Sequence, residues 1–391
     1  MHSDWSLLAK FGRKWTMMAL AVPCVAGWAL VIWAQNLSML LIGRFFLGLA
    51  GGAFHVAAPQ YSSEISEKEI RGTLGSFCIV NMNAGILLTY VVGAYVSVFW
   101  TSVVSGVIPV AFALIFVFMP ESPHFLVIKN REDEARETLK WLRGSAYDPN
   151  REINELRHEF EENRNNKATF KEILERPATK RALFIGFGLM LFQQLCGINA
   201  VIFYSTFIFT EAKTDIEPHI QTIIVGTVLL LSCLTSGFLA DRFGWRKLLM
   251  ISSVFMTLML GVLGLYFLLL DNDSEVVGSL AWLPLASLII FLITNSVGYR
   301  TLPWVIISEI YPKDCKLMAG PLNGAFCWLI AFAVTASFGK IIDGIGAGPT
   351  FFMFSGLSFV GIFFTYFAVI ETKAKSMAEI QRILAGEKSL K

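Results

Sequence analysis

Long apolar runs separated by short polar segments follow one another along most of the chain. Most are close to 20 residues long, the length at which an α-helix crosses the ~30 Å hydrocarbon core of a bilayer. Charged residues rarely interrupt them. The pattern predicts about ten transmembrane helices, at Trp15–Ala34, Leu40–Gln60, Leu74–Val96, Phe99–Met119, Ala182–Phe209, Ile220–Ala240, Leu248–Leu270, Leu280–Ile307, Met318–Ile341 and Thr350–Ile370. We therefore expect an all-α membrane protein.

The composition agrees with this interpretation. Of the 391 residues, 55% are hydrophobic and 16% are charged, and the mean hydropathy is +0.59. The first run begins too late and is too long for the apolar core of a cleaved secretory signal. The 6 cysteines stand singly, without the spacing of a zinc site or a disulfide framework. We interpret them as small apolar core residues.

One long polar segment divides the chain. Residues 121–181 contain 13 Lys/Arg and 13 Asp/Glu, with two groups of apolar residues at helical spacing on either side of Pro149. The groups are Ala135, Leu139 and Leu142, then Ile153, Leu156 and Phe160. They predict short amphipathic helices; a featureless solvated linker is the alternative. The predicted domains are a first half with about four spans at 1–120, the helical linker at 121–181, a six-helix half at 182–371 and a tail at 372–391.

The positive charges are distributed unequally between the two sides of the predicted membrane. All but four of the 32 Lys/Arg lie on the side that holds both termini, the exceptions being Lys213, Lys340, Arg44 and Arg300. The positive-inside rule places that side in the cytoplasm. Sequons for N-glycosylation begin at Asn36 and Asn272 on the opposite side. The segment around Asn36 is expected to lie too close to the membrane, so Asn272 is the predicted glycosylation site.

Three charged signatures occur twice in the chain. Phe11-Gly12-Arg13-Lys14 returns as Phe243-Gly244-Trp245-Arg246-Lys247, Glu64 with Arg71-Gly72 returns as Glu309 with Lys316, and Pro120-Glu121-Ser122 returns as Ile370-Glu371-Thr372-Lys373. The copies are 232, 245 and 250 residues apart. Offsets this similar predict two structurally related halves, an architecture common among membrane transporters. Two apolar runs precede Gly244 in its half and none precedes Gly12, so we expect a first half that lacks two helices.

The repeated charges all fall at the ends of spans on the predicted cytoplasmic side. Charges at a membrane boundary are costly unless they are paired, and they tend to be functional. We interpret them as a gate in which pairs between the halves close the cytoplasmic side; topology anchoring and surface solvation are the alternative. The predicted gating residues are Glu64, Arg71, Glu121, Asp241, Arg242, Arg246, Glu309, Lys316 and Glu371.

The most polar segment within a span is Phe192-Gln193-Gln194-Leu195-Cys196-Gly197-Ile198-Asn199, which Tyr204 follows. On a helix, Asn199 comes within reach of the side that carries the two glutamines. Three neutral amides favour a cavity for a neutral polyhydroxylated ligand, with helix–helix hydrogen bonds as the alternative. In another span, Gly298 and Pro303 indicate a broken helix. Trp304 and Trp328 either offer flat faces to a sugar or pack in the core.

The residues do not indicate catalysis. The 5 histidines are scattered, and no Gly-rich phosphate loop follows a strand pattern. We predict no catalytic residue, no metal site and no cofactor, and we expect the protein not to be an enzyme.

These motifs resemble the sugar porter family of the major facilitator superfamily, which includes facilitative glucose and trehalose transporters. The resemblance covers nearly the whole chain after about residue 7. The matching segments are Phe11–Lys14 and Asp241–Arg246 (the two D-R-x-G-R-R/K loops), Gly43-Arg44 with Gly48, Glu64, Arg71-Gly72, Pro120–Leu126 (P-E-S-P-R-W-L), Gln193–Asn199 (Q-Q-x-x-G-I-N), Pro303-Trp304 and Ile370–Ala374 (P-E-T-K-G). The resemblance implies a major-facilitator bundle reduced to about ten helices. It also implies that Gln193, Gln194 and Asn199 bind sugar.

The chain departs from the family pattern at several positions. The departures are Ala9 and Lys10 in place of Asp-Arg, Trp245 in place of a gate arginine, Ile79 for a glutamine on helix five, Leu229 for an asparagine on helix eight, Cys327 for an asparagine on helix eleven, and Arg300 for a glycine in the flexible G-P-G-P stretch. The retained sugar-binding amides therefore come from helix seven alone.

The implied function is transport of a neutral sugar, trehalose or a hexose such as glucose, by alternating access. Facilitated diffusion is favoured because no acidic residue is evident in the middle of a run. The predicted binding residues are Gln193, Gln194, Asn199, Tyr204, Trp304 and Trp328. The alternative is a transport-inactive truncated isoform, or a sugar-sensing or regulatory relative. We expect a multi-pass plasma-membrane protein with both termini in the cytoplasm, whose partners are a sugar and the lipid bilayer and not nucleic acid.

Overall fold

The computed structural model describes residues 11–67, 69–165, 175–214, 216–373 and 375–386. At 71–73, 75, 76, 159–165, 235–243, 275, 313, 314, 317 and 318 it describes the backbone alone. Every regular element in these ranges is helical, which confirms the all-α prediction. The chain divides into two compact units, residues 1–167 and 168–391. The division falls inside the polar segment at 121–181.

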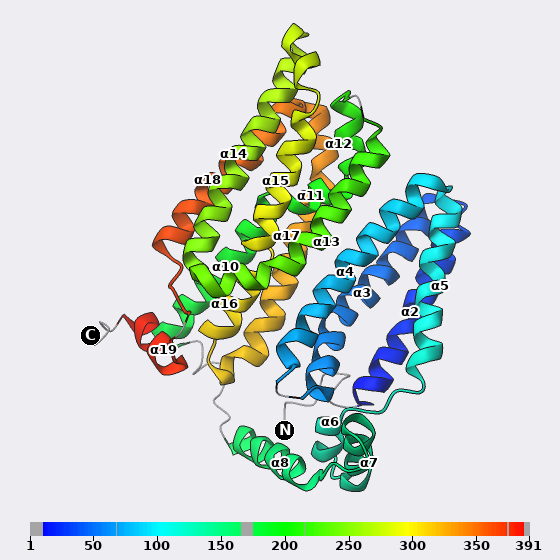
Figure 1. Cartoon of the computed structure of the whole chain (residues 1–391), viewed down its shortest axis with the longest axis vertical. Coiled ribbons are helices and arrows are strands. Elements are labelled where there is room, and N and C mark those ends of the chain that lie inside the picture. Colours follow the sequence, from blue (N-terminus) through cyan, green and yellow to red (C-terminus); the bar gives the residue numbers. More distant parts are fainter. Residues whose placement is uncertain (1–10, 68, 166–174, 215, 374, 387–391) are drawn as a thin grey trace. The chain divides into compact units, whose positions relative to one another are not determined.

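Four long helices form the membrane part of the first unit (Figure 1, blue to cyan). They are α2 (Arg13–Ile32), α3 (Leu37–Ile65), α4 (Arg71–Tyr95) and α5 (Val98–Phe116). Helices α2 and α3 pack closely because Gly27 and Gly43 face each other. A Cβ on either glycine would lie 2.9 Å from the carbonyl oxygen of the other, so only small residues allow this approach. Asn36 begins α3 by accepting the N–H of Met39 at 2.8 Å.

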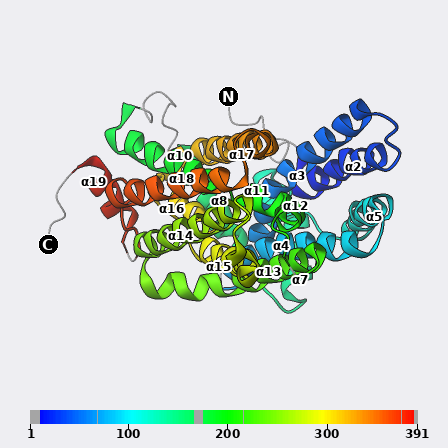
Figure 2. The same ribbon diagram turned by 90° about the horizontal axis from the view of Figure 1, so that it is seen from above.

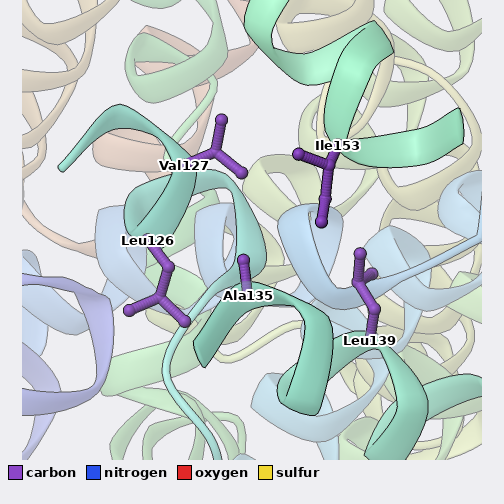
Figure 3. Packing of buried hydrophobic residues seen from close by; sticks show 5 residues of the cluster. All are labelled: Leu126, Val127, Ala135, Leu139 and Ile153. Carbon is purple, nitrogen blue, oxygen red and sulfur yellow. The ribbon is translucent and has the colours of Figure 1, made fainter. Parts of the chain in front are cut away.

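Three short helices follow at one end of this unit. They are α6 (Pro123–Ile128), α7 (Glu132–Arg143) and α8 (Asn150–Asn165). Acidic residues in the first turn of α7 and basic residues in its last turn complement the helix dipole. The three helices enclose a small core, shown in Figure 3, of Leu126, Val127, Ala135, Leu139 and Ile153. Two of these helices lie where the apolar spacing predicts them, on either side of Pro149.

The second unit contains the remaining helices (Figures 1 and 2). They are α10 (Pro177–Leu195), α11 (Ile198–Phe203), α12 (Ser205–Glu211), α13 (Pro218–Phe243), α14 (Trp245–Asp271), the 3-10 turn η1 (Glu275–Leu280), α15 (Leu283–Val297), α16 (Leu302–Ile310), α17 (Lys313–Ile345), α18 (Ala347–Phe367) and α19 (Met377–Ala385). Helix α14 packs along α18 and α15, and α10 packs against α17. Ile380 and Leu384 of α19 are buried, so this tail helix docks on the unit.

The described residues contain 9 helical segments long and apolar enough to cross a membrane. The remaining predicted span corresponds to α13, which has 26 residues, although its described apolar part, Pro218–Leu234, is shorter. Two predicted spans are interrupted. The run at 182–209 breaks at Gly197, and the run at 280–307 breaks after Val297. The predicted ends are also displaced, because α3 continues to Ile65 and α10 begins at Pro177.

Candidate functional site

In the first unit, a carboxylate caps the beginning of α2. Glu121 Oε1 accepts the backbone N–H groups of Arg13 at 2.9 Å and Lys14 at 3.1 Å. Gly12 precedes the helix with φ +95°, and a Cβ there would overlap the Glu121 carboxylate. A negative charge is favoured at a helix N-terminus, where the first N–H groups have no partner within the helix. Gly12 and Glu121 therefore form a single capping device across 109 residues of sequence.

An ion pair lies directly beside this cap. Arg13 Nε contacts Glu64 Oε2 at 2.8 Å and Oε1 at 3.0 Å, and its Nη2 contacts Oε1 at 2.8 Å. The Arg13 and Glu64 side chains are only 7% and 11% exposed. Glu64 also accepts hydrogen bonds from Gln60 Nε2, at 3.0 Å, and from the Ser122 hydroxyl. The pair is bidentate, and further hydrogen bonds satisfy the Glu64 carboxylate. A buried ion pair is most favourable in this geometry.

The second unit repeats the cap. Glu371 accepts the backbone N–H groups of Trp245 and Arg246, each at 3.1 Å, at the start of α14. Gly244 precedes this helix with φ +83°, and a Cβ there would lie 3.1 Å from Glu371 Oε2. The repeat of charged signatures in the sequence thus corresponds to a repeat of hydrogen-bonding geometry. We call these two clusters, around Glu121 and around Glu371, the charged ends of the units.

The two charged ends differ in their ion pairing. Glu309 stands in place of Glu64, but Trp245 stands in place of Arg13. In the part of the chain that the structure describes, Glu309 Oε2 and Trp245 Nε1 are buried without a hydrogen-bond partner. The guanidinium of Arg246 instead lies 5.5 Å from the centre of the Tyr366 ring and donates to the carbonyl oxygen of Tyr366. The second unit therefore has the cap without the arginine–carboxylate pair.

The remaining predicted gating residues are placed less fully. The Lys316 side chain is exposed. Arg71, Asp241 and Arg242 lie in α4 and α13, and their side chains lie outside the described part of the chain. Pairing between the halves stays a prediction.

A second ion pair, not expected from the sequence, joins the short helices to α3. Arg143 contacts the Glu152 carboxylate at 2.7 and 2.8 Å and donates to the carbonyl oxygen of Ile65 at 3.3 Å. Tyr147 donates to Glu152 at 2.8 Å. Burial alone would raise the pKa of Glu152, but hydrogen bonds from Arg143 and Tyr147 outweigh it and leave the pKa below its ordinary value. Arg143 thereby fixes α7 and α8 to the end of α3.

The three predicted amides come together in the second unit. Asn199 Nδ2 donates to Gln194 Oε1 at 2.6 Å, and Gln194 Nε2 contacts Cys327 Sγ at 3.0 Å. The Cys327 thiol contacts Gln193 Oε1 at 3.4 Å. The sequence predicts that the three amides lie on one continuous helix, but the structure divides them between two helices. Helix α10 ends at Leu195, and Gly197, with φ +78°, turns the chain so that Asn199 at the start of α11 returns to Gln194.

Gln193 stabilises the broken helix between α15 and α16. Its Nε2 donates to the carbonyl oxygens of Tyr299 at 2.6 Å and Arg300 at 3.1 Å. The break releases these carbonyls from helical hydrogen bonding, and membranes tolerate such groups only where protein or a cavity satisfies them. The Tyr299 hydroxyl contacts Thr365 Oγ1 at 2.6 Å, which holds the break against α18. Gln193 and Gln194 are only 5% and 6% exposed.

The predicted aromatic residues lie along the same unit. Tyr204 donates to the carbonyl oxygen of Thr335 at 3.2 Å, and its ring centre is 4.9 Å from that of Phe338. Trp328 follows Cys327 on α17 and is 48% exposed, whereas Trp304 is half-buried at the start of α16. Sequence reasoning missed Cys327 as the residue that links the amides. The family has asparagine at this position, immediately before Trp328. That correspondence could have indicated that Cys327 contacts the amides.

Comparison with known proteins fits this architecture. The family model described as "Sugar (and other) transporter" matches residues 6–384. The chain belongs to this sugar transporter family. It is 38% identical over 383 residues to the facilitated trehalose transporter Tret1 of Bombyx mori, covering 97% of this chain and 75% of that protein. It is 36% identical over 382 residues to Tret1 of Aedes aegypti, covering 97% of this chain but 47% of that protein. The chain thus spans about half the length of the Aedes relative.

Solved structures support the fold. The inward-open xylose transporter XylE from E. coli superimposes with a TM-score of 0.79 at 21% identity, covering 96% of this chain and 84% of that chain. The helical units therefore adopt the fold of the major facilitator superfamily, as the resemblance implied. The family is one of transporters rather than enzymes, and the protein is a multi-pass membrane protein.

Proposed function

We propose that this sugar transporter family member carries a neutral sugar, trehalose or a hexose such as glucose, across a membrane by facilitated diffusion. Relatives in two insects are named as facilitated trehalose transporters. The proton:xylose symporter XylE, which is similar in fold, has been solved with bound 6-bromo-6-deoxy-D-glucose. No acidic residue is evident in the middle of a predicted span, so facilitated diffusion is favoured over proton coupling.

The amide network beside the helix break carries this proposal. Gln194, Asn199 and Cys327 supply neutral donors and acceptors at one place, next to the break between α15 and α16. Sugar hydroxyls both donate and accept, so they replace amide–amide hydrogen bonds without leaving a buried charge. Gln194 and Asn199 are the proposed ligands. A sugar that binds to them breaks only the one hydrogen bond between their side chains. Gln193 supports the break and acts as a ligand to a lesser degree.

Three aromatic residues complete the proposed binding site. Trp304, Trp328 and Tyr204 offer flat faces on which the C–H surfaces of a sugar ring pack. Trp328, next to Cys327, has the greatest exposed fraction of the three and is the proposed stacking partner. The hydroxyl of Tyr204 is bonded to α17 in this conformation.

The charged ends are the proposed inner gate. In each unit, one carboxylate fixes the start of a long helix, and a second carboxylate lies close by. The nine predicted gating residues would form ion pairs between the halves. Alternating access would break and re-form these pairs. Arg71, Asp241 and Arg242 belong to this proposal through their place in the repeated signatures. Because, among the described residues, only the first unit has the arginine–carboxylate pair, we expect its charged end to be the more stable of the two.

The proposed location is the plasma membrane, with both termini in the cytoplasm. The Lys/Arg bias supports this orientation. Asn272 is exposed at the C-terminal end of α14, which is the end opposite to the charged end of the second unit, and it is the proposed glycosylation site. Asn36, by contrast, uses its side chain to cap α3.

Uptake of labelled trehalose and glucose into vesicles that contain the purified protein tests the proposal. We expect saturable uptake that Gln194→Ala abolishes. Gln221→Ala is the matched control, because Gln221 is a buried amide of the same unit whose Nε2 donates at 2.7 Å to the carbonyl oxygen of Ile216, outside the network. Uptake is normalised to folded protein. Correctly inserted protein without uptake would contradict the proposal and favour the transport-inactive or sensing alternative.

A further inference from the structure

An open apolar groove runs between α10 and α18 in the second unit, two helices that lie beside each other (Figure 2). Its volume is about 520 Å³, which is within the usual range of small-ligand sites, ~300–1,000 Å³. Five of the nine residues that line it are phenylalanines. They are Phe184, Phe192, Phe363, Phe364 and Phe367. Arg181 is the charged residue of the lining.

The walls of the groove are shaped by specific packing. The ring of Phe364 lies against α10 because Gly188 leaves space for it, and a Cβ at Gly188 would overlap the ring. The Phe364 ring centre is 5.1 Å from that of Phe192 and 5.8 Å from that of Phe184. Phe184 and Phe367 are nevertheless 64% and 74% exposed. Because α10 and α18 both qualify as membrane spans by length and composition, we expect these exposed rings to face lipid chains.

One end of the groove is positively charged. Arg181 is exposed in the second turn of α10 and makes one long hydrogen bond, 3.4 Å, to the carbonyl oxygen of Ile383. No carboxylate pairs with it among the residues that the structure describes. The helix itself begins at Pro177 without a side-chain cap, so its N-terminus adds partial positive charge. The Lys/Arg bias predicts that this end faces the cytoplasm.

We propose that this groove binds one anionic phospholipid of the bilayer. Its acyl chain lies on the phenylalanine surface, and its phosphate-bearing head contacts Arg181. The occupant must be apolar along the groove and negative at the boundary, and an anionic phospholipid combines both properties in one molecule. Basic pockets between transmembrane helices on the cytoplasmic side recognise such head groups, and each cation near the surface contributes about 1 kcal/mol. One arginine therefore gives a preference of about fivefold over a zwitterionic lipid.

Native mass spectrometry of the full chain, taken from vesicles of phosphatidylcholine with phosphatidylserine, measures the affinity for each lipid. We expect phosphatidylserine to bind about fivefold more tightly than phosphatidylcholine, a preference that Arg181→Ala removes. Lys180→Ala is the matched control, because it removes the same charge from the adjacent position, which does not line the groove. Val360→Trp fills the groove without changing the charge, and we expect it to weaken binding of both lipids.

Three results would overturn the proposal. They are the absence of any preference in the wild-type protein, equal losses in Arg181→Ala and Lys180→Ala, and unchanged binding in Val360→Trp. Equal losses would indicate diffuse surface charge, and unchanged binding would place the lipid elsewhere. Arg181 and Val360 are both exposed, so these variants are expected to fold, and the midpoint of thermal unfolding checks this. The readout is lipid binding and does not depend on transport.

Discussion

Arg13 and Glu64 form a buried, bidentate ion pair that joins the beginning of α2 to the end of α3, with Nε 2.8 Å from Oε2. The repeat places Trp245 and Glu309 at the corresponding positions of the second unit, where no such pair exists among the described residues. Each unit thus has the same kind of carboxylate cap, but only in the first unit does the described part of the chain place an arginine–carboxylate pair beside it. The stability of the charged ends, of the helix break and of the Arg143–Glu152 contact can each be measured.

Removal of one partner from the buried pair should destabilise the protein strongly. Arg13→Met leaves Glu64 charged and buried, a change that typically costs about 3–5 kcal/mol. The double variant Arg13→Met with Glu64→Gln should recover part of this loss, because no unpaired charge remains. The free energy of unfolding in detergent measures both effects. Equal stability of the single variant and the wild-type protein would show that the pair is not formed.

Restoration of the missing arginine should stabilise the second unit. Trp245→Arg supplies a donor for Glu309, and a hydrogen bond to a charged group contributes about 1.5–3 kcal/mol. Glu309→Gln should remove most of this gain. The measurement is the free energy of unfolding of the wild-type protein, the two single variants and the double variant. A gain that persists without the Glu309 carboxylate would contradict the assignment of Glu309 as the counterpart of Glu64.

Substitution of the capping glycines separates backbone strain from the carboxylate contact. Gly12 and Gly244 precede α2 and α14, and Gly144 follows α7. All three have φ between +83° and +96°, in a region that other residues enter only at a cost of about 1–3 kcal/mol. An added Cβ overlaps Glu121 at Gly12, touches Glu371 at Gly244 and meets open space at Gly144. Stability loss on change to alanine should therefore decrease in the order Gly12, Gly244, Gly144. Equal losses would mean that the carboxylates do not press against the glycines.

Loss of the Gln193 amide should loosen the helix break. Gln193→Ala leaves the carbonyl oxygens of Tyr299 and Arg300 without their amide donor, and an unsatisfied buried group costs about 1–3 kcal/mol. Gln194→Ala leaves those carbonyls satisfied and should cost less stability. Amide hydrogen exchange along α16 distinguishes the two variants. Faster exchange in Gln194→Ala than in Gln193→Ala would contradict the division of roles.

The Arg143–Glu152 contact should fail on acidification. The pKa of Glu152 in the folded protein lies below its ordinary value of 4.5, so its stabilising effect is fully present above pH 4.5 and is lost as the pH falls through the folded pKa. The protection of the α8 backbone amides, measured as the intrinsic exchange rate at each pH divided by the observed rate, should fall over that range. Glu152→Gln should show low protection at every pH. A wild-type protein whose protection does not fall would show that α8 is held by its apolar core alone.

The charged repeat in the sequence predicts that Gly12 and Gly244 occupy equivalent positions, because a glycine beside paired charges stands out in an apolar chain. The sequence predicts which amides lie together, but it does not predict that a helix ends between them. Gly197 follows the early end of α10, and only the resulting turn returns Asn199 to Gln194. Cys327 escaped prediction because a lone cysteine within an apolar span resembles a core residue. The roles of Arg143 and Glu152 were hidden by the many other charges of the segment at 121–181.

Counterflow is the most direct test of facilitated sugar transport. Vesicles that contain the protein are loaded with unlabelled trehalose, and labelled trehalose is then added outside. Alternating access without coupling predicts a transient accumulation of label inside that an imposed pH gradient does not change and that Gln194→Ala abolishes. Entry of label no faster than in protein-free vesicles, with the protein folded and inserted, would contradict the account.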